Sequence, residues 1–177
     1  MQQKQTQKAR AITPELRRRL LILGAKIIGI ILVIYILLFR IYGLTRIDTN
    51  VMAPSVKGGD LALIFRPVGE LSVGDVVSYH CGDRACTGRI AAKAGDAVDV
   101  NEEGKIIING HAEDIASYGD VIFPQNSTMT YPYMVAENQY FILGDNRSEY
   151  DDSRTYGSID KEAIIGQVIG VFRTNAI

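Results

Sequence analysis

The feature that most constrains this chain is residues 20–39, a run of 20 residues that contains one charged side chain, Lys26. A helix of that length rises about 30 Å, which matches the hydrocarbon core of a bilayer. Lys26 lies in the first third of the run, where its side chain can extend toward the head groups. The sequence therefore predicts one transmembrane helix over residues 20–39.

The charges on the two sides of this segment differ in sign. Six basic residues and one acid, Glu15, precede Leu20, whereas 12 basic and 19 acidic residues follow from Arg40 onward. Basic flanks remain on the cytoplasmic side of a membrane. The predicted organisation is a cytoplasmic N-terminus over 1–19, a membrane helix over 20–39 and an extracytoplasmic domain over 40–177.

A cleavable secretory signal is the alternative interpretation of the apolar segment. Such a signal has a shorter apolar core, and no small-residue cleavage motif follows Phe39. The anchored interpretation is therefore favoured. The acidic domain also excludes a nucleic-acid-binding function, which would require a basic surface.

Strand patterns dominate the chain after the membrane segment. Short apolar or alternating runs, separated by Gly, Asp and Asn, occur at 61–66, 75–80, 89–93, 97–100, 105–109, 140–143 and 164–172. They predict a mostly β domain of short antiparallel strands. Residues 112–135 are the least regular part, and their aromatic side chains either pack or form a partner surface: Tyr118, Phe123, Tyr131 and Tyr133.

Cys81 and Cys86 enclose the four residues GDRA between two strand-like runs. A hairpin turn of this length places its flanking residues opposite each other, and the extracytoplasmic environment permits a disulfide. Two free thiols or a metal site are the alternatives, but no further ligand cluster accompanies the cysteines. The sequence predicts a disulfide, and it predicts neither a metal nor a cofactor.

Three segments carry a family resemblance. They are VMAPSV at 51–56, VGDVVSYH with GRIAAKAGD at 73–80 and 88–96, and LGDNRSEYDDSRTYG at 143–157. In their order and spacing they resemble the bacterial type I signal peptidases, membrane-anchored serine peptidases that remove signal peptides, and the small Gram-positive members in particular. The resemblance covers about residues 15–173 and implies the signal-peptidase antiparallel β fold.

The catalytic pair of that family is missing here. In the family a serine attacks the peptide carbonyl, and a lysine with a lowered pKa accepts its proton. Carried over by position, the nucleophile falls on Val51 and the base on Gly88, which have no reactive group. A third departure is Tyr150, where the family has a serine that helps to orient the lysine. The resemblance therefore implies a degenerate, non-proteolytic site.

The rest of the family pattern is present. The resemblance implies a structural role, including an ion pair between Asp152 and Arg154, for Gly144, Asp145, Asn146, Arg147, Asp152, Ser153 and Arg154. It also implies a peptide-binding cleft, with the Thr49 hydroxyl beside the carbonyl-binding site. The cleft residues would be Thr49, Val51, Met52, Pro54, Gly88 and Tyr150.

The sequence is compatible with three functions. The first is a non-proteolytic protein that binds a secreted polypeptide and assists pilus assembly, as signal-peptidase-like proteins without the dyad do in Gram-positive pilus clusters. Its partners would be a pilin and a sortase. The second is an active signal peptidase with a relocated dyad, Ser55 with Lys57, and the third is an inert membrane-anchored scaffold. The presence of Met52 and Pro54 favours the first.

The predicted topology is testable by cysteine labelling in intact cells. A cysteine at Glu15 should resist a membrane-impermeant thiol reagent, whereas a cysteine at Glu103 should react, because the basic flank keeps the N-terminus in the cytoplasm. Both should react once the cells are permeabilised. The opposite labelling pattern before permeabilisation would show that the orientation is wrong.

Overall fold

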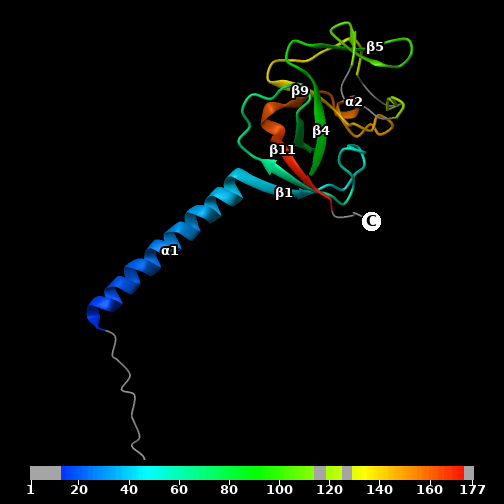
Figure 1. Ribbon diagram of the computed structural model, residues 1–177. Helices are drawn as coiled ribbons and strands as arrows, with labels where there is room; N and C mark the ends of the chain where they lie inside the picture. Colours follow the sequence, from blue (N-terminus) through cyan, green and yellow to red (C-terminus); the bar gives the residue numbers. More distant parts are fainter. Residues whose placement is uncertain (1–12, 114–118, 125–128, 174–177) are drawn as a thin grey trace, which may run out of the picture. The chain divides into compact units, whose positions relative to one another are not determined.

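The computed structural model describes residues 13–113, 119–124 and 129–173 (Figure 1). Helix α1 (Pro14–Ile41) contains the predicted span and extends it by one turn or more toward the N-terminus. Thr13 precedes it as a cap, with its hydroxyl accepting from the Leu16 N–H at 3.4 Å, and proline is well suited to the first helical position. Within the described residues, α1 is the helix long and apolar enough to cross a bilayer.

The chain divides into two compact units, Met1–Phe39 and Arg40–Ile177. The second unit contains two antiparallel sheets. The larger sheet has the order β1-β2-β11-β3-β4-β9-β10. Its strands are β1 (Tyr42–Arg46), β2 (Leu61–Phe65), β3 (Val76–Cys81), β4 (Arg84–Lys93), β9 (Gln139–Leu143), β10 (Ile159–Asp160) and β11 (Ile164–Phe172).

The smaller sheet has the order β7-β6-β5-β8. Its strands are β5 (Ala97–Val100), β6 (Ile106–Ile108), β7 (His111–Ala112) and β8 (Tyr133–Met134). A one-turn helix, α2 (Ser153–Tyr156), follows β9, and the 3₁₀ turn η1 (Lys161–Ala163) precedes β11.

The predicted fold class is confirmed, because all seven predicted runs form strands and all strand pairs are antiparallel. The sequence did not predict β1, β7, β8, β10 and α2. Four of these elements have only two to four residues, too few to show a period. Their existence depends on partners that are distant in the sequence.

The hydrophobic core forms on both faces of β9. Ile142 belongs to one cluster with Tyr79 and Ile90, whereas its neighbours Phe141 and Leu143 belong to another. This alternation follows from the two-residue period of a strand. Because both faces of β9 are covered, its C-terminal end at Leu143 is a rigid platform for the residues that follow.

The irregular segment 112–135 contributes to this core wherever it is described. Phe123, Tyr131 and Tyr133 pack against the cluster that contains Phe141, and the rings of Phe123 and Tyr131 meet edge to face at 5.7 Å. Burial raises the pKa of the Tyr131 phenol to about 12. These three side chains therefore have a packing role, and Tyr118 lies outside the described residues.

A fully buried ion pair ties α2 to the end of β9. Arg154 Nη2 lies 2.7 Å from Asp152 Oδ2, and both side chains have no solvent-exposed surface. Asp152 also accepts the Gly144 N–H at 2.9 Å and caps α2 by accepting the Arg154 N–H at 3.0 Å. The Ser153 hydroxyl accepts the Ile142 N–H at 2.9 Å. The loop after β9 is thus held by hydrogen bonds to buried side chains.

Replacing Asp152 by Asn should destabilise the fold by about 3–5 kcal/mol, because the Arg154 guanidinium would remain buried without a counter-charge. The free energy of unfolding would be measured by denaturant titration of the full chain in detergent. The control is Glu103→Gln, which breaks a pair with Lys105 whose side chains are both about two-thirds exposed. The control should unfold like the parent, and equal effects of the two variants would contradict the prediction.

Candidate functional site

Residues 51–56 form a hydrogen-bonded turn between β1 and β2. The Ala53 N–H donates to the Asn50 carbonyl at 3.0 Å, and the Val56 N–H donates to the Met52 carbonyl at 2.9 Å. Met52 is 1% exposed and packs with Ile47, Val56 and Ala62. Met52 therefore anchors the turn from inside and has almost no surface to offer to a ligand.

The geometry assumed for a relocated dyad is absent. Ser55 and Lys57 would share a face only if their segment were extended, whereas Ser55 lies in the turn. Both residues are exposed, and the Lys57 N–H donates to the Asp60 carboxylate at 3.0 Å. Ser55 with Lys57 is thus a poor candidate for a dyad.

Val51 is held against the loop after β9. Its carbonyl accepts the Asn146 N–H at 2.9 Å, and its side chain is 3% exposed. A Cβ atom at Gly144 would collide with Val51 Cγ1 and lie 2.6 Å from the Val51 carbonyl oxygen. Gly144 must therefore lack a side chain for the turn to approach so closely.

Gly88 lies in β4 at the same end of β9. The register pairs Ile90 with Ile142 and Arg89 with Leu143, so one further step places Gly88 beside Gly144. Val51 lies where a Cβ atom of Gly144 would be. The two positions to which the family resemblance assigns the nucleophile and the base thus converge on one glycine.

The space beside Gly88 is filled by other side chains. A Cβ atom there would lie 2.5 Å from Ile142 Cγ2 and 3.5 Å from Tyr79 Cε1. Both Ile142 and Tyr79 are fully buried. A lysine at this position would therefore require the core to rearrange.

Neither neighbouring titratable side chain can replace the missing base. Burial, followed by the charges of Asp152 and Asp151, raises the pKa of the Tyr79 phenol, so it stays protonated. Arg89 donates two hydrogen bonds to Asp145, at 2.8 and 2.7 Å, and these raise its pKa. Both groups are locked in their protonated forms at neutral pH.

A groove of about 120 Å³ runs between two backbone segments, one of which directly precedes Gly88 in the sequence. One wall is residues 45–49, and the other is residues 84–87 at the start of β4. β4 pairs with β3 over residues 84–89 but with β9 only from Arg89 to Lys93. In the described part of the chain, residues 84–88 therefore have one strand edge without a partner strand. Unpaired edges present N–H and C=O groups to which an extended peptide can bind.

The predicted cleft residues are only partly at this groove. Thr49 is half-buried and lines it. Pro54 is exposed on the neighbouring turn, and Met52 and Val51 are buried beneath it. Tyr150 is 45% exposed but is not among the lining residues. Sequence reasoning missed the lining residues Thr45, Arg46, Ile47, Asp48, Arg84, Ala85, Cys86 and Thr87.

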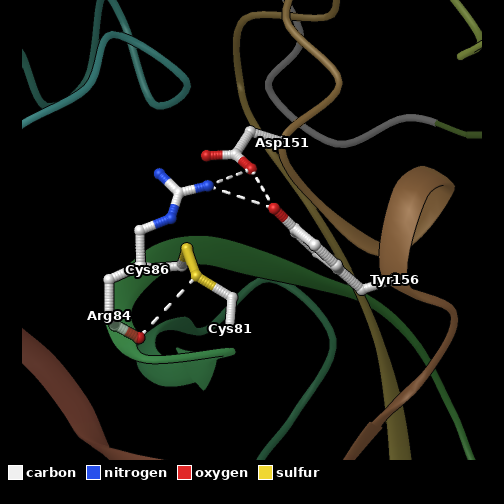
Figure 2. Close-up of a disulfide and its surroundings, with 5 residues drawn as sticks. All are labelled: Cys81, Arg84, Cys86, Asp151 and Tyr156. Atoms are coloured by element: carbon white, nitrogen blue, oxygen red, sulfur yellow. Dashed lines mark hydrogen bonds and ion pairs between the residues drawn. A yellow bond between two sulfur atoms is a disulfide. The ribbon is translucent and has the colours of Figure 1, made fainter.

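The β3–β4 hairpin carries the predicted disulfide between Cys81 and Cys86, with Cα atoms 5.8 Å apart (Figure 2). Arg84, the first residue of β4, lies 2.6 Å from the Asp151 carboxylate and donates to the Tyr156 hydroxyl at 3.1 Å. Asp151 thus ties the loop after β9 to the β3–β4 hairpin through Arg84.

Two further charged residues of the loop after β9, Asp145 and Arg147, are also paired within the fold. Asp145 pairs with Arg89, and Arg147 pairs with Glu113 in a buried contact. Among residues 13–113, 119–124 and 129–173 there is no group of three His, Cys, Asp or Glu side chains that could hold a metal. A larger hollow of about 530 Å³ is lined by Glu113 and Gly119, which border undescribed residues, and we assign no function to it.

The domain is an antiparallel β structure in which the turn at residues 51–56, with Met52 and Pro54, packs on the loop after β9. This arrangement defines a protein of the signal-peptidase class. The family model described as signal peptidase, peptidase S26, matches residues 20–173. The chain therefore belongs to this family.

Curated relatives include proteins named inactive signal peptidase and proteins named signal peptidase. Proteins named inactive signal peptidase IA from Staphylococcus aureus are 27% identical over 149 residues, which is 80% of this chain and 84% of theirs. A protein named signal peptidase I from Haemophilus influenzae is 34% identical over 71 residues, 40% of this chain and 20% of its own. The Staphylococcus match thus extends over most of both chains.

Among solved structures, a signal peptidase I from Enterococcus faecalis is similar with a TM-score of 0.42 at 21% identity. The similarity covers 57% of this chain and 98% of that one.

Gly88→Ala should destabilise the domain by about 1–3 kcal/mol, because the added methyl group would overlap Ile142 Cγ2. The measurement is the free energy of unfolding of the full chain. In an Ile142→Ala background the same substitution should be less harmful, which gives a coupling energy above about 0.5 kcal/mol.

Gly69→Ala is the matched control, because a Cβ atom there meets nothing within 4 Å. Additive effects at positions 88 and 142, or equal effects of Gly88→Ala and Gly69→Ala, would show that the space beside Gly88 is open.

Proposed function

We propose that this chain is a non-proteolytic, membrane-anchored signal-peptidase-like protein that binds an extended segment of a secreted polypeptide in the groove between residues 45–49 and 84–87. The observation that carries the proposal is the unpaired edge of β4 over residues 84–88, directly along one wall of that groove. The relatives named inactive support the non-proteolytic part.

Peptide binding at this edge would not require a nucleophile or a base. In strand addition the backbone N–H and C=O groups of the edge bind the backbone of the ligand, and neighbouring pockets select its side chains. Five residues in an extended strand span about 16 Å, which is enough to pair with a client segment of similar length. The groove is small, so it would favour clients with small side chains beside β4.

Proteolysis is disfavoured by the packing as well as by the missing groups. Val51 and Gly88 offer no nucleophile and no base, and loss of such groups lowers turnover by about 10⁶-fold. Ile142 and Tyr79 occupy the space into which a side chain at position 88 would extend. Restoring the pair as Val51→Ser with Gly88→Lys should therefore not restore activity.

The client that fits the family resemblance is a pilin, and the second partner is a sortase. The predicted topology places the β domain on the same side of the membrane as secreted pilins. A protein that holds one segment of a pilin extended would present it to a membrane-anchored sortase. The inert scaffold remains the competing function, and it requires no occupant of the groove.

The experiment is to fill the groove and measure pilin polymerisation in cells. Ala85 is exposed and lines the groove, so Ala85→Trp should block it and reduce the high-mass pilin polymers on immunoblots at least about tenfold. Ala136→Trp is the control, because Ala136 is exposed and does not line the groove. Val51→Trp would be a poor choice, since Val51 is buried against Gly144.

Normal polymerisation with Ala85→Trp, at parental protein levels, would show that the groove is not used and would favour the inert scaffold. The purified full chain in detergent should also leave a signal-peptide substrate intact. Cleavage that disappears in Ser55→Ala would overturn the non-proteolytic function and establish the relocated dyad.

A further inference from the structure

The start of β4 is tied to a distant part of the chain by three polar side chains, which we call the Arg84 clasp: Arg84, Asp151 and Tyr156. Arg84 Nη2 lies 2.6 Å from Asp151 Oδ1 and 3.1 Å from the Tyr156 hydroxyl, 67 and 72 residues along the chain. The Tyr156 hydroxyl donates to the same Asp151 oxygen at 2.5 Å. Figure 2 shows the closed triangle above the Cys81–Cys86 disulfide.

The clasp contacts the part of the β3–β4 hairpin that does not pair with other strands of the sheet. β3 pairs with β11 only as far as Tyr79, and β4 pairs with β9 only from Arg89. Between these points the hairpin has its own ladder and disulfide, which fix its two strands to each other. The clasp instead fixes the hairpin to the segment that contains α2, and α2 is anchored by the buried Asp152.

The two hydrogen-bond donors of the clasp, Arg84 and Tyr156, keep their protons at neutral pH. The hydrogen bond with Asp151 raises the pKa of Arg84, and the hydrogen bond with Asp151 also raises the pKa of the Tyr156 phenol. Arg84 therefore stays charged and Tyr156 stays a donor. The Arg84 side chain is 52% exposed, so its ion pair contributes little to global stability and acts locally.

We propose that the Arg84 clasp positions the unpaired edge at residues 84–88 for the client strand. Ordering a strand edge at the moment of binding opposes association, because each residue that must be fixed loses conformational entropy. An edge that is ordered beforehand avoids this loss. Arg84, Asp151 and Tyr156 are then positioning residues for the groove. This inference rests on the peptide-binding function proposed above.

The first measurement is hydrogen exchange of the full chain in detergent without any client. In Asp151→Ala, the β4 amides that pair with β3 should exchange about fivefold faster, the factor expected from losing an exposed polar contact. Tyr156→Phe removes one hydroxyl and should give a smaller increase. The melting temperature should stay near that of the parent in both, because the clasp is not part of the buried core.

The second measurement is pilin polymerisation in cells with the same variants. Asp151→Ala should reduce it, and the charge swap Arg84→Asp with Asp151→Arg should restore both polymerisation and slow exchange. Glu103→Ala, which breaks the exposed pair with Lys105, is the matched control and should change neither. The swap exchanges the two charges but keeps an ion pair between positions 84 and 151. Restoration would therefore show that the ion pair, and not either side chain by itself, positions the strand edge.

The outcomes separate this inference from the proposed function. Unchanged exchange at residues 85–88 in Asp151→Ala would overturn the clasp directly. If Ala85→Trp abolishes polymerisation but Asp151→Ala does not, the groove is used and the clasp inference is wrong. If neither variant affects polymerisation although exchange rises, the proposed function fails, and the inference fails with it.

Discussion

The buried contact between Asp152 and Arg154 is the interaction on which most of the site depends. Asp152 accepts hydrogen bonds from the Gly144 and Arg154 backbones, and Arg154 donates to the carbonyls of Ile122 and Arg147 at 2.7 and 2.8 Å. A charge that is fully removed from water must be compensated by such bonds. Because each partner is satisfied, the loop after β9 has one well-defined conformation.

That conformation in turn positions the two segments that form the candidate site. Gly144 receives the turn at residues 51–56, and the Asn146 backbone holds the Val51 carbonyl. The same loop continues into Asp151 and α2, which reach the β3–β4 hairpin through Arg84. One short loop therefore contacts both the turn that contains Val51 and the start of β4, which forms one wall of the groove.

The structure of the groove does not depend on the catalytic side chains of the family. The groove requires the strand pairing of β3 with β4, the break in pairing with β9 and the packed turn, and none of these requires a serine or a lysine. The reactive groups are absent at Val51 and Gly88, while Ile142 and Tyr79 fill the core beside Gly88. The shape of the groove therefore does not depend on which side chains occupy positions 51 and 88.

The sequence by itself determined the features that depend on neighbours in the chain. These include an apolar helix long enough to cross a bilayer, seven strands with their turns, the disulfide across four residues and the lack of a nucleophile at Val51. Only the tertiary structure decided where β4 lacks a partner, that Gly88 faces Ile142, and that Arg84 meets Asp151. It also showed Met52 to be an anchor and Tyr150 to lie apart from the groove. The physical reason is that local patterns report burial and turns, whereas an open edge depends on distant strands. β4 and β9 pair residues that are 47 or more positions apart, and their pairing leaves part of β4 uncovered.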